Sequence, residues 1–147
     1  MNAWSRAAPI AALALALALA GCGNPFAPRF EEAVRDRVAN ANIGVSSVDI
    51  SETVDTGNKC TIIGVDLVMD GDTITSEQLE TALSIIGPAL DGRDRVCHIG
   101  LGARTADGER ISVHPAADEL GLDADDYYRN TFSIAFERDV VRRDFGN

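Results

Sequence analysis

The sequence predicts an α+β domain, a two-layer sandwich in which helices cover one face of a mixed sheet of about five strands. Three observations predict this fold class. Segments with helical spacing of apolar residues alternate with segments of period two, in the order α-β-β-α-β-β-α-β. Residues 29–147 are enough for one domain with a core and too few for two ordinary domains. This segment also contains two cysteines placed for a disulfide.

The first predicted elements are a helix and two strands. A helix is expected over 28–40, with Pro28 in its first turn. Residues 45–54 alternate loosely between apolar and polar, which is typical of a half-buried strand. After the turn-forming residues 55–58, the segment Cys60–Met69 is apolar on both faces, so we expect it to be a central strand. The apolar positions of the helix are Phe30, Ala33, Val34, Val38 and Ala41.

The second predicted helix has the clearest local signature. Thr75 and Gln78 have the spacing of a capping box, and Ile74 can pack on Leu79 as a hydrophobic staple. We expect Gly87-Pro88 to end the regular helix. Its predicted apolar face consists of Leu79, Ala82, Leu83 and Ile86.

A strand over 95–104 follows, and a turn at 106–108 leads into a short hairpin partner at 111–113. The side of the longer strand that we expect to be buried carries Cys97, Ile99, Leu101 and Ala103. From Cys60 onward the order is β-α-β-β-α-β, so a ferredoxin-like, split βαβ arrangement is also possible.

The C-terminal part has weaker signals. Pro115–Leu120 suggests one helical turn, and Asp123 is a possible cap for another turn that contains Tyr127 and Tyr128. Residues 131–136 alternate as a strand. The charged tail that follows, from Asp139 to Asn147, could form a final helical turn.

The N-terminal residues have a pattern typical of export. Arg6 is the one charged side chain before an Ala- and Leu-rich run over 11–20, which is closed by Leu19-Ala20-Gly21-Cys22. A positive head, an apolar middle and small residues at the cut are typical of a secretory signal peptide. With its cysteine, the segment resembles the signal sequences of bacterial lipoproteins, whose lipobox reads Leu, a small residue, Gly or Ala, then Cys.

The lipoprotein resemblance implies that residues 1–21 are removed and that the Cys22 thiol carries a diacylglycerol. Residues 22–28 would then be the lipidated cysteine and its tether. Two acyl chains suffice for stable anchoring, so the protein is expected outside the cytoplasmic membrane on its outer side, or on the outer membrane of a cell that has one. The rival interpretation, a spanning helix, is disfavoured because the apolar run is shorter than the roughly 20 residues that a bilayer core requires.

Cys60 and Cys97 are predicted to form a disulfide, because an exported even pair has no reducing system around it. Both lie at the start of a predicted strand, so the two starts must come within about 7 Å between Cα atoms. Adjacent parallel strands satisfy this, and so do cysteines just outside the sheet. We favour the second slightly, because a shared face for the cysteines would place Asp66 beside Ile99 and Leu101.

The charge of the chain limits its partners. Without residues 1–21 it has 12 basic and 23 acidic side chains, a net charge of −11, because Arg6 is the only charge removed. This sign argues against nucleic acid and against electrostatic adhesion to anionic headgroups, so the lipid on Cys22 alone would hold the protein to the membrane. We expect an envelope protein as partner, and no cofactor.

The chain contains few residues that suggest catalysis. It has no phosphate-binding glycine loop, nucleophile elbow or zinc-protease motif. His98 should lie beside Gly100 and Gly102, away from the core, and we interpret it as a partly exposed structural residue rather than a general base. His114, just before a predicted helical turn, is interpreted as a loop residue. No catalytic residue is therefore assigned.

Metal binding is disfavoured as well. Two distant thiols without a Cys-x-x-Cys pair do not suggest a zinc site. Asp70-Gly71-Asp72 and Asp123-Ala124-Asp125-Asp126 are candidate cation sites, but each lacks the spacing of a calcium loop. Tyr127 and Tyr128 could form a binding edge, although the scarcity of aromatic residues favours a core role.

Three functional hypotheses remain. The first is a non-catalytic, lipid-anchored binding or accessory module of the cell envelope. The second is a carrier for an apolar ligand, with Gly64, Gly100 and Gly102 leaving room between sheet and helices, which requires a cavity of at least about 300 Å³. The third, an envelope hydrolase, requires His98 or His114 within hydrogen-bond reach of both a nucleophile and a carboxylate.

Overall fold

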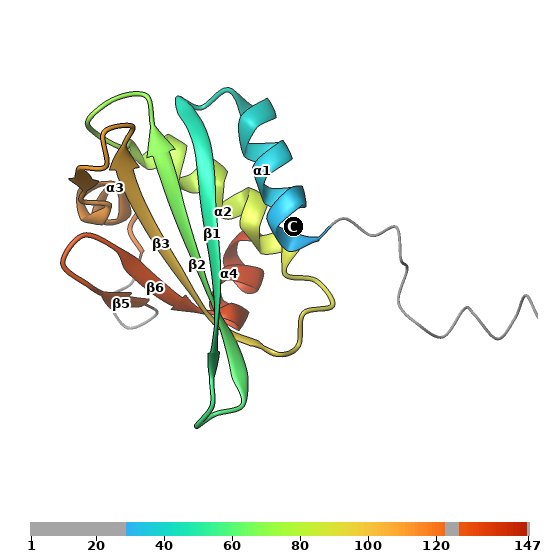
Figure 1. Cartoon of the computed structure of the whole chain (residues 1–147). Coiled ribbons are helices and arrows are strands. Elements are labelled where there is room, and N and C mark those ends of the chain that lie inside the picture. Colours follow the sequence, from blue (N-terminus) through green and yellow to red (C-terminus); the bar gives the residue numbers. More distant parts are fainter. Residues whose placement is uncertain (1–28, 123–126, 147) are drawn as a thin grey trace, which may run out of the picture.

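The computed structural model describes residues 29–122 and 127–146 as four helices and a six-stranded sheet (Figure 1). In chain order, the elements are α1 (Phe30–Ala41), β1 (Val45–Asp55), β2 (Cys60–Met69), α2 (Ser76–Ala89), β3 (Val96–Thr105), β4 (Arg110–Ile111), α3 (His114–Glu119), β5 (Tyr127–Arg129), β6 (Ile134–Glu137) and α4 (Arg138–Phe145).

The sheet is mixed, with strand order β1-β2-β3-β6-β5 and with β4 paired to β3. β2 and β3 are parallel neighbours, and the remaining pairs are antiparallel. Helices α1, α2 and α4 lie together on one face of the sheet and leave the other face uncovered (Figure 1). The two-layer α+β prediction is therefore confirmed. The ferredoxin-like variant is wrong, because no strand separates β2 from β3.

The predicted disulfide is present, and its cysteines lie inside the sheet. Cys60 is the first residue of β2 and Cys97 the second of β3, with their Cα atoms 5.7 Å apart. Adjacent parallel strands satisfy the distance, as the sequence allowed. The slight preference for cysteines outside the sheet was wrong.

A bulge explains why that preference failed. Thr61 pairs with Val96 while the next residue, Ile62, pairs with His98, so the residue between Val96 and His98 has no partner opposite it. This extra residue is Cys97. A bulge shifts the alternation of side chains by one position. The cysteines can therefore meet while Asp66 stays beside Gly102 instead of beside the apolar side chains of β3.

Helix α2 begins as predicted and ends later. The hydroxyl of Thr75 accepts a bond from the Gln78 amide, and the Gln78 side chain accepts one from the Thr75 amide. The Gln78 side chain also donates to the carbonyl of Ile43, which ties the helix start to the turn between α1 and β1. The helix continues through Pro88 to Ala89. A proline is tolerated this close to the C-terminus because only one helical hydrogen bond is lost.

The C-terminal elements differ from the predictions in one place. Tyr127 begins a short strand, β5, that pairs with β6, so the helical turn predicted around it is wrong. Cross-strand pairing with Phe136 outweighs the weak local signal at this position. The proposed cap Asp123 and the first-turn Pro28 lie outside the described residues. The charged tail forms α4.

The hydrophobic core lies between the sheet and the helices. It buries one row of side chains from each central strand against apolar faces of α1, α2, α3 and α4. The large side chains with less than 2% exposure are Phe30, Phe136, Ile63, Leu67, Met69, Leu79, Leu83, Ile86, Leu90, Ile99, Leu101 and Ile134. The described chain thus has one core and one uncovered sheet face.

Candidate functional site

The uncovered face of the sheet is unusually short of side chains at its centre. Ser51, Gly64, Gly100 and Ala135 are aligned across β1, β2, β3 and β6 by the strand pairing. The next row contains Gly102 beside Asp66. A solvent-exposed sheet face normally carries larger polar or β-branched residues, and glycine inside a strand costs about 0.5–1 kcal/mol relative to alanine.

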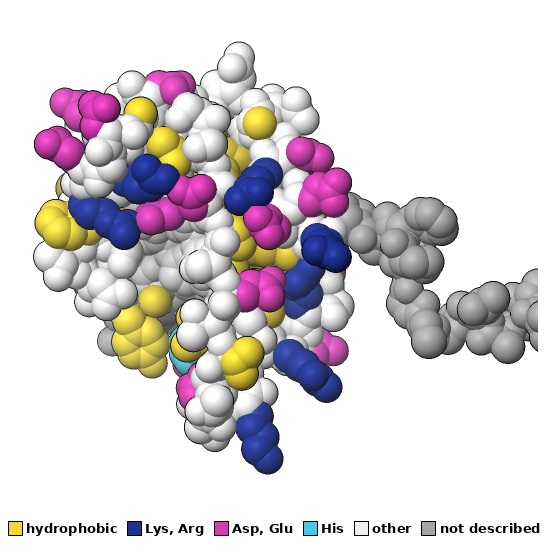
Figure 2. Space-filling model, in the orientation of Figure 1, with side chains coloured by type: hydrophobic (Ala, Val, Ile, Leu, Met, Phe, Trp, Pro, Cys, Tyr) yellow, Lys and Arg dark blue, Asp and Glu magenta, His cyan; other side chains and the backbone are white. Residues whose placement is uncertain are grey.

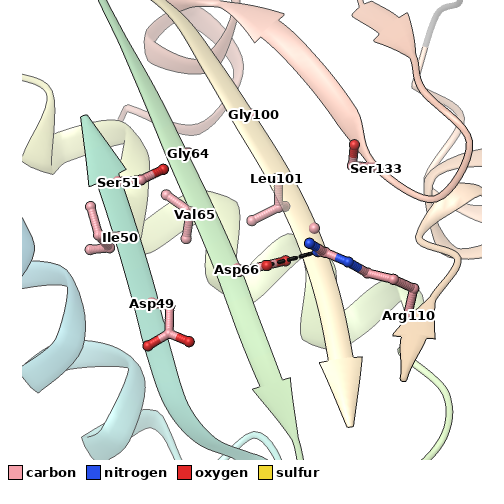
Figure 3. Close-up of a pocket in the computed structure, with 11 residues that line it drawn as sticks. Asp49, Ile50, Ser51, Gly64, Val65, Asp66, Gly100, Leu101, Arg110 and Ser133 are labelled. Carbon is pink, nitrogen blue, oxygen red and sulfur yellow. Dashed lines mark hydrogen bonds and ion pairs between the residues drawn. The ribbon is translucent and has the colours of Figure 1, made fainter. Parts of the chain in front are cut away.

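This lack of side chains leaves a hollow of about 330 Å³ over β1, β2 and β3 (Figures 2 and 3). A smaller hollow of about 230 Å³ adjoins it toward the turn between β5 and β6, and it shares Gly102, Arg110 and Ser133 with the larger one. The larger hollow is lined by Asp49, Ile50, Ser51, Gly64, Val65, Asp66, Gly100, Leu101, Gly102, Arg110 and Ser133.

Two of the three glycines are explained by the protein's own packing. A Cβ atom at Gly64 would lie 2.6 Å from Oγ of Ser51, and one at Gly102 would lie 2.5 Å from Oδ1 of Asp66. Both distances are too short for a real contact. At these positions glycine makes room for side chains of neighbouring strands.

Gly100 has no such explanation. A Cβ atom there would meet nothing closer than the backbone oxygen of Ile63, at 3.9 Å. Its φ is not in the left-handed region that favours glycine. Glycine in a strand interior often marks the close approach of a ligand or of another backbone. Gly100 therefore leaves an open floor that packing among residues 29–122 and 127–146 does not require.

Two ion pairs stand at one end of the hollow. Arg110 donates from Nη1 to both carboxylate oxygens of Asp66, at 2.9 and 2.7 Å, as drawn in Figure 3. Arg104 of β3 pairs with Asp49 of β1, across the intervening strand β2. Each acid is balanced by a base, so this end offers donors and acceptors without a net charge, although the chain is strongly acidic.

Aromatic side chains lie on the β5–β6 side of the same face. Tyr128 is 61% exposed and Phe132 is 45% exposed. Tyr128 pairs with Ala135 of β6, so it continues the row of aligned residues that crosses the hollow at Gly64 and Gly100. Its ring makes an edge-on contact with the His98 ring, with the centroids 6.3 Å apart. Exposed aromatic residues beside a hollow are typical of binding surfaces.

The two interpretations of the tyrosines, a core role and a binding edge, each fit one of the two residues. Tyr127 is buried and packs against Phe136, with the ring centroids 5.7 Å apart, so it has the core role that was favoured. Tyr128 lies on the open face and fits the binding-edge interpretation. Alternation along β5 could have separated the two, but only after that segment had been recognised as a strand.

The glycine prediction was wrong about the location of the free space. Gly64, Gly100 and Gly102 do not lie between sheet and helices, since they pair with residues of the uncovered face. The space between sheet and helices is filled by the core side chains. A ligand would therefore have to bind on the outside of the sheet, where the lining includes ion pairs and hydroxyl groups.

The histidines lie in different parts of the described structure. His98 is on the open face of β3, as predicted, with Glu137 opposite it on β6. His114 is the first residue of α3, not a loop residue, and its Nε2 lies 3.2 Å from the carbonyl oxygen of Ser133. Within the described residues, neither imidazole bonds to both a nucleophile and a carboxylate.

Of the other predicted sites, some lie within the described residues and some do not. Asp70 and Asp72 are exposed in the loop after β2, and the described residues contain no group of three or more possible metal ligands. Asp123-Ala124-Asp125-Asp126 and Cys22 lie outside the described residues. None of the described helices is long and apolar enough to cross a bilayer.

Among the described carboxylates whose pKa is lowered by hydrogen bonds, Asp118 and Asp55 lie where elements of the sheet are connected. Arg129 donates to Asp118 and holds the pKa of that carboxyl below its ordinary value, and this bond joins β5 to α3. The side chain of Asn58, helped by backbone amides of Asn58 and Gly57, lowers the pKa of Asp55 at the β1–β2 turn. Both carboxylates stabilise connections at the periphery of the sheet.

A comparison of the chain with protein-family models, with curated proteins and with solved structures found no match. The geometry of the uncovered face and the N-terminal sequence are therefore the basis for a functional conclusion.

Proposed function

We propose that this protein is an exported, lipid-anchored binding or accessory module of the bacterial cell envelope, and that the hollow above Gly100 receives a surface of a partner protein. The lipobox that ends at Cys22 supports export and anchoring. Two acyl chains on that cysteine would tether the domain without a spanning helix.

The observation that carries the binding role is the open floor at Gly100. Two neighbouring glycines accommodate side chains of the protein itself, but none of the described residues uses the space over Gly100. Exposed Tyr128 and Phe132 lie on one side of that space, and the neutral pair Asp66–Arg110 lies at its end. Aromatic residues and arginine are enriched in protein interfaces.

Anchoring is tested with Cys22→Ala in the full-length chain. The wild-type protein should incorporate labelled fatty acid and sediment with membranes. The variant should remain an unmodified precursor, or be released if another site is cut. An unchanged mass and an unchanged membrane fraction in the variant would remove the anchoring proposal.

The binding surface is tested by photo-crosslinking from position 128. Benzoylphenylalanine in place of Tyr128 keeps an aromatic side chain at the rim of the hollow. We expect it to crosslink an envelope protein in living cells, and Gly100→Leu, which fills the hollow, should abolish the crosslink.

Gly71→Leu is the matched control, because Gly71 is a loop position with nothing within 4 Å of an added Cβ and no positive φ. A crosslink that survives Gly100→Leu as well as Gly71→Leu would show that the hollow is not the binding surface. If the adduct is a lipid or small molecule that Gly100→Leu removes, the carrier hypothesis replaces the protein-binding one.

A further inference from the structure

Strand β1 leaves one long backbone edge of the sheet open. It is 11 residues long and pairs with β2 on one side. Among the described residues no strand pairs with its other side. In Figure 1 its lower half projects with β2 beyond the rest of the sheet. An edge of this kind presents a row of amide and carbonyl groups to which another chain can add.

The register shows which groups face outward. The amide of Thr61 donates to the carbonyl of Arg95 on the β3 side, at 2.7 Å. Odd-numbered residues of β2 therefore bond toward β3, and even-numbered ones bond toward β1, where they pair with odd-numbered residues. Beyond the register irregularity at the start of β1, its even-numbered residues direct their amides and carbonyls to the free edge; these residues are Val48, Ile50, Glu52 and Val54.

The described part of the chain covers only the start of this edge. Nε of Arg35, on α1, donates to the outward carbonyl of Val48 at 2.9 Å. The register irregularity of β1 lies between Val45 and Ser47, also near its start. Beyond Val48 the strand has no proline and no lysine, two residues that commonly block sheet edges, and Val54 is 66% exposed. Ile50–Val54 is thus the part available for pairing.

A second copy of this chain is a poor occupant. Antiparallel self-pairing that uses the whole of the available Ile50–Val54 segment is centred on Glu52, so it would place Glu52 opposite itself and Asp49 opposite Asp55. Like charges directly opposite each other destabilise a strand pair. The occupant should therefore be a different chain that lacks acidic residues in the paired segment.

The chain's own tether is also unsuited. Pro25 and Pro28 are three residues apart, so one of them would fall at a hydrogen-bonding position of an added strand. The place where the tether joins the domain is informative, however. The Arg93 guanidinium lies 5.1 Å from the ring centroid of Phe30, the first residue of α1, and 3.8 Å from Oε1 of Glu52.

The free edge therefore lies close to the start of α1. Cys22 is 7 residues before Arg29, which allows at most about 24 Å of extended chain at ~3.4 Å per residue. If Cys22 is lipidated, which is part of the proposed function, the edge is held near the bilayer surface. Partner segments within reach are those that emerge from membrane proteins.

We propose that the Ile50–Val54 edge of β1 accepts an extended, non-acidic segment of an envelope membrane protein as an additional strand of the sheet. Main-chain hydrogen bonds to Ile50, Glu52 and Val54 provide the affinity in this mode of recognition. This docking site is distinct from the hollow above Gly100, although Asp49, Ile50 and Ser51 of the same strand line the hollow.

The test uses the full-length chain in its own envelope, with photo-crosslinkers placed singly at Ser51 and Thr53, in wild type and in Gly100→Leu. Because Ser51 also lines the hollow, crosslinks that belong to the strand edge are those that survive Gly100→Leu. Because these positions are two residues apart on one face, their crosslinks should map to partner residues two apart in one segment. Glu52→Pro removes an outward amide and should abolish both crosslinks. Glu52→Ala removes the same side chain but keeps the amide, so it should retain them.

Thermal unfolding of each variant shows whether it is folded, and Val54→Pro replaces Glu52→Pro if the latter unfolds. Crosslinks that persist in the folded proline variant, or that scatter over unrelated segments, overturn strand addition. If position 128 crosslinks a partner while positions 51 and 53 do not, the inference fails and the proposed function stands. If positions 51 and 53 give paired crosslinks and position 128 gives none, strand addition at the β1 edge stands and binding in the hollow fails.

Discussion

Cys60 and Cys97 join the starts of two parallel strands through a bulge, with Cα atoms 5.7 Å apart. The two strands are also connected through α2, so the disulfide closes a loop around this β-α-β crossover unit. This arrangement fixes the register on which the open face and its hollow depend.

Removal of the disulfide should lower the free energy of unfolding. A crosslink between residues separated by 37 positions limits the unfolded chain and stabilises the fold by up to about 4 kcal/mol. We expect the double variant Cys60→Ala/Cys97→Ala to have a free energy of unfolding lower than that of wild type by up to this amount. Its midpoint of urea unfolding should therefore lie at a lower concentration. Wild type unfolded with and without reductant is the control, and equal midpoints in all cases would contradict a stabilising role.

Substitution of each of the three open-face glycines by alanine should change the stability of the protein by a different amount. Gly100→Ala should leave stability unchanged or raise it by roughly 0.5 kcal/mol, because the new Cβ has room and the unfolded chain loses freedom. Gly102→Ala should lower stability by about 1 kcal/mol, since its Cβ displaces the Asp66 carboxylate from Arg110. Gly64→Ala should have an intermediate effect, because only the Ser51 hydroxyl must rotate.

Chemical denaturation of the three variants beside wild type measures these differences. A large loss of stability in Gly100→Ala would mean that the floor of the hollow is needed for folding, and it would remove the argument for a ligand.

The contribution of the α2 capping box to stability should be measurable by substitution of a single side chain. Thr75→Ala removes the acceptor for the Gln78 amide, and loss of an N-cap costs about 1 kcal/mol. Glu80→Ala, at an exposed position of the same helix, should change stability by a few tenths of a kcal/mol. Equal unfolding midpoints for the two variants would show that the cap contributes nothing beyond the helix propensity of alanine.

The Asp118–Arg129 contact should make stability depend on pH in the acid range. Because the bond from Arg129 lowers the pKa of Asp118 in the folded state, its contribution is present above the unfolded pKa of about 3.9. It is lost as the pH falls through the lower folded value. Asp118→Asn should thus destabilise the protein at pH 7 and have little effect near pH 2.

Urea unfolding of wild type and Asp118→Asn across this range tests the prediction. Glu119→Gln, which removes the same charge from the neighbouring residue, controls for the change in net charge. A destabilisation of Asp118→Asn that is constant from pH 2 to 7 would show that the carboxylate does not act through its ionised form.

Much of the fold could be predicted from local patterns. The bounds of β2 and the capping box of α2 were predicted residue by residue, because alternation and caps are written in adjacent residues. The short strand β5 was missed. Three residues have too little periodicity to predict a strand, and their conformation depends on pairing with β6.

For the candidate site, the sequence indicated some of the residues but not their arrangement in space. Gly64, Gly100 and Gly102 were recognised as a source of space, but were assigned to the wrong face of the sheet. The sequence contains no signal for the bulge at Cys97, which sets the face of every later residue of β3 relative to the disulfide. No local pattern could show that Gly64 and Gly102 are crowded while Gly100 is open, because the crowding atoms come from other strands.

The sequence by itself determined the order of most helices and strands, the cap of α2 and the pairing of the two cysteines. It also contains the segment resembling a lipobox, on which the anchoring proposal rests. These features depend on residues near each other in the chain or on simple counting. The tertiary structure alone decided which face of the sheet stays uncovered, where the hollow lies and which edge of β1 is free. Those features depend on strand neighbours and helix packing, which are set by burial of the whole core rather than by any local segment.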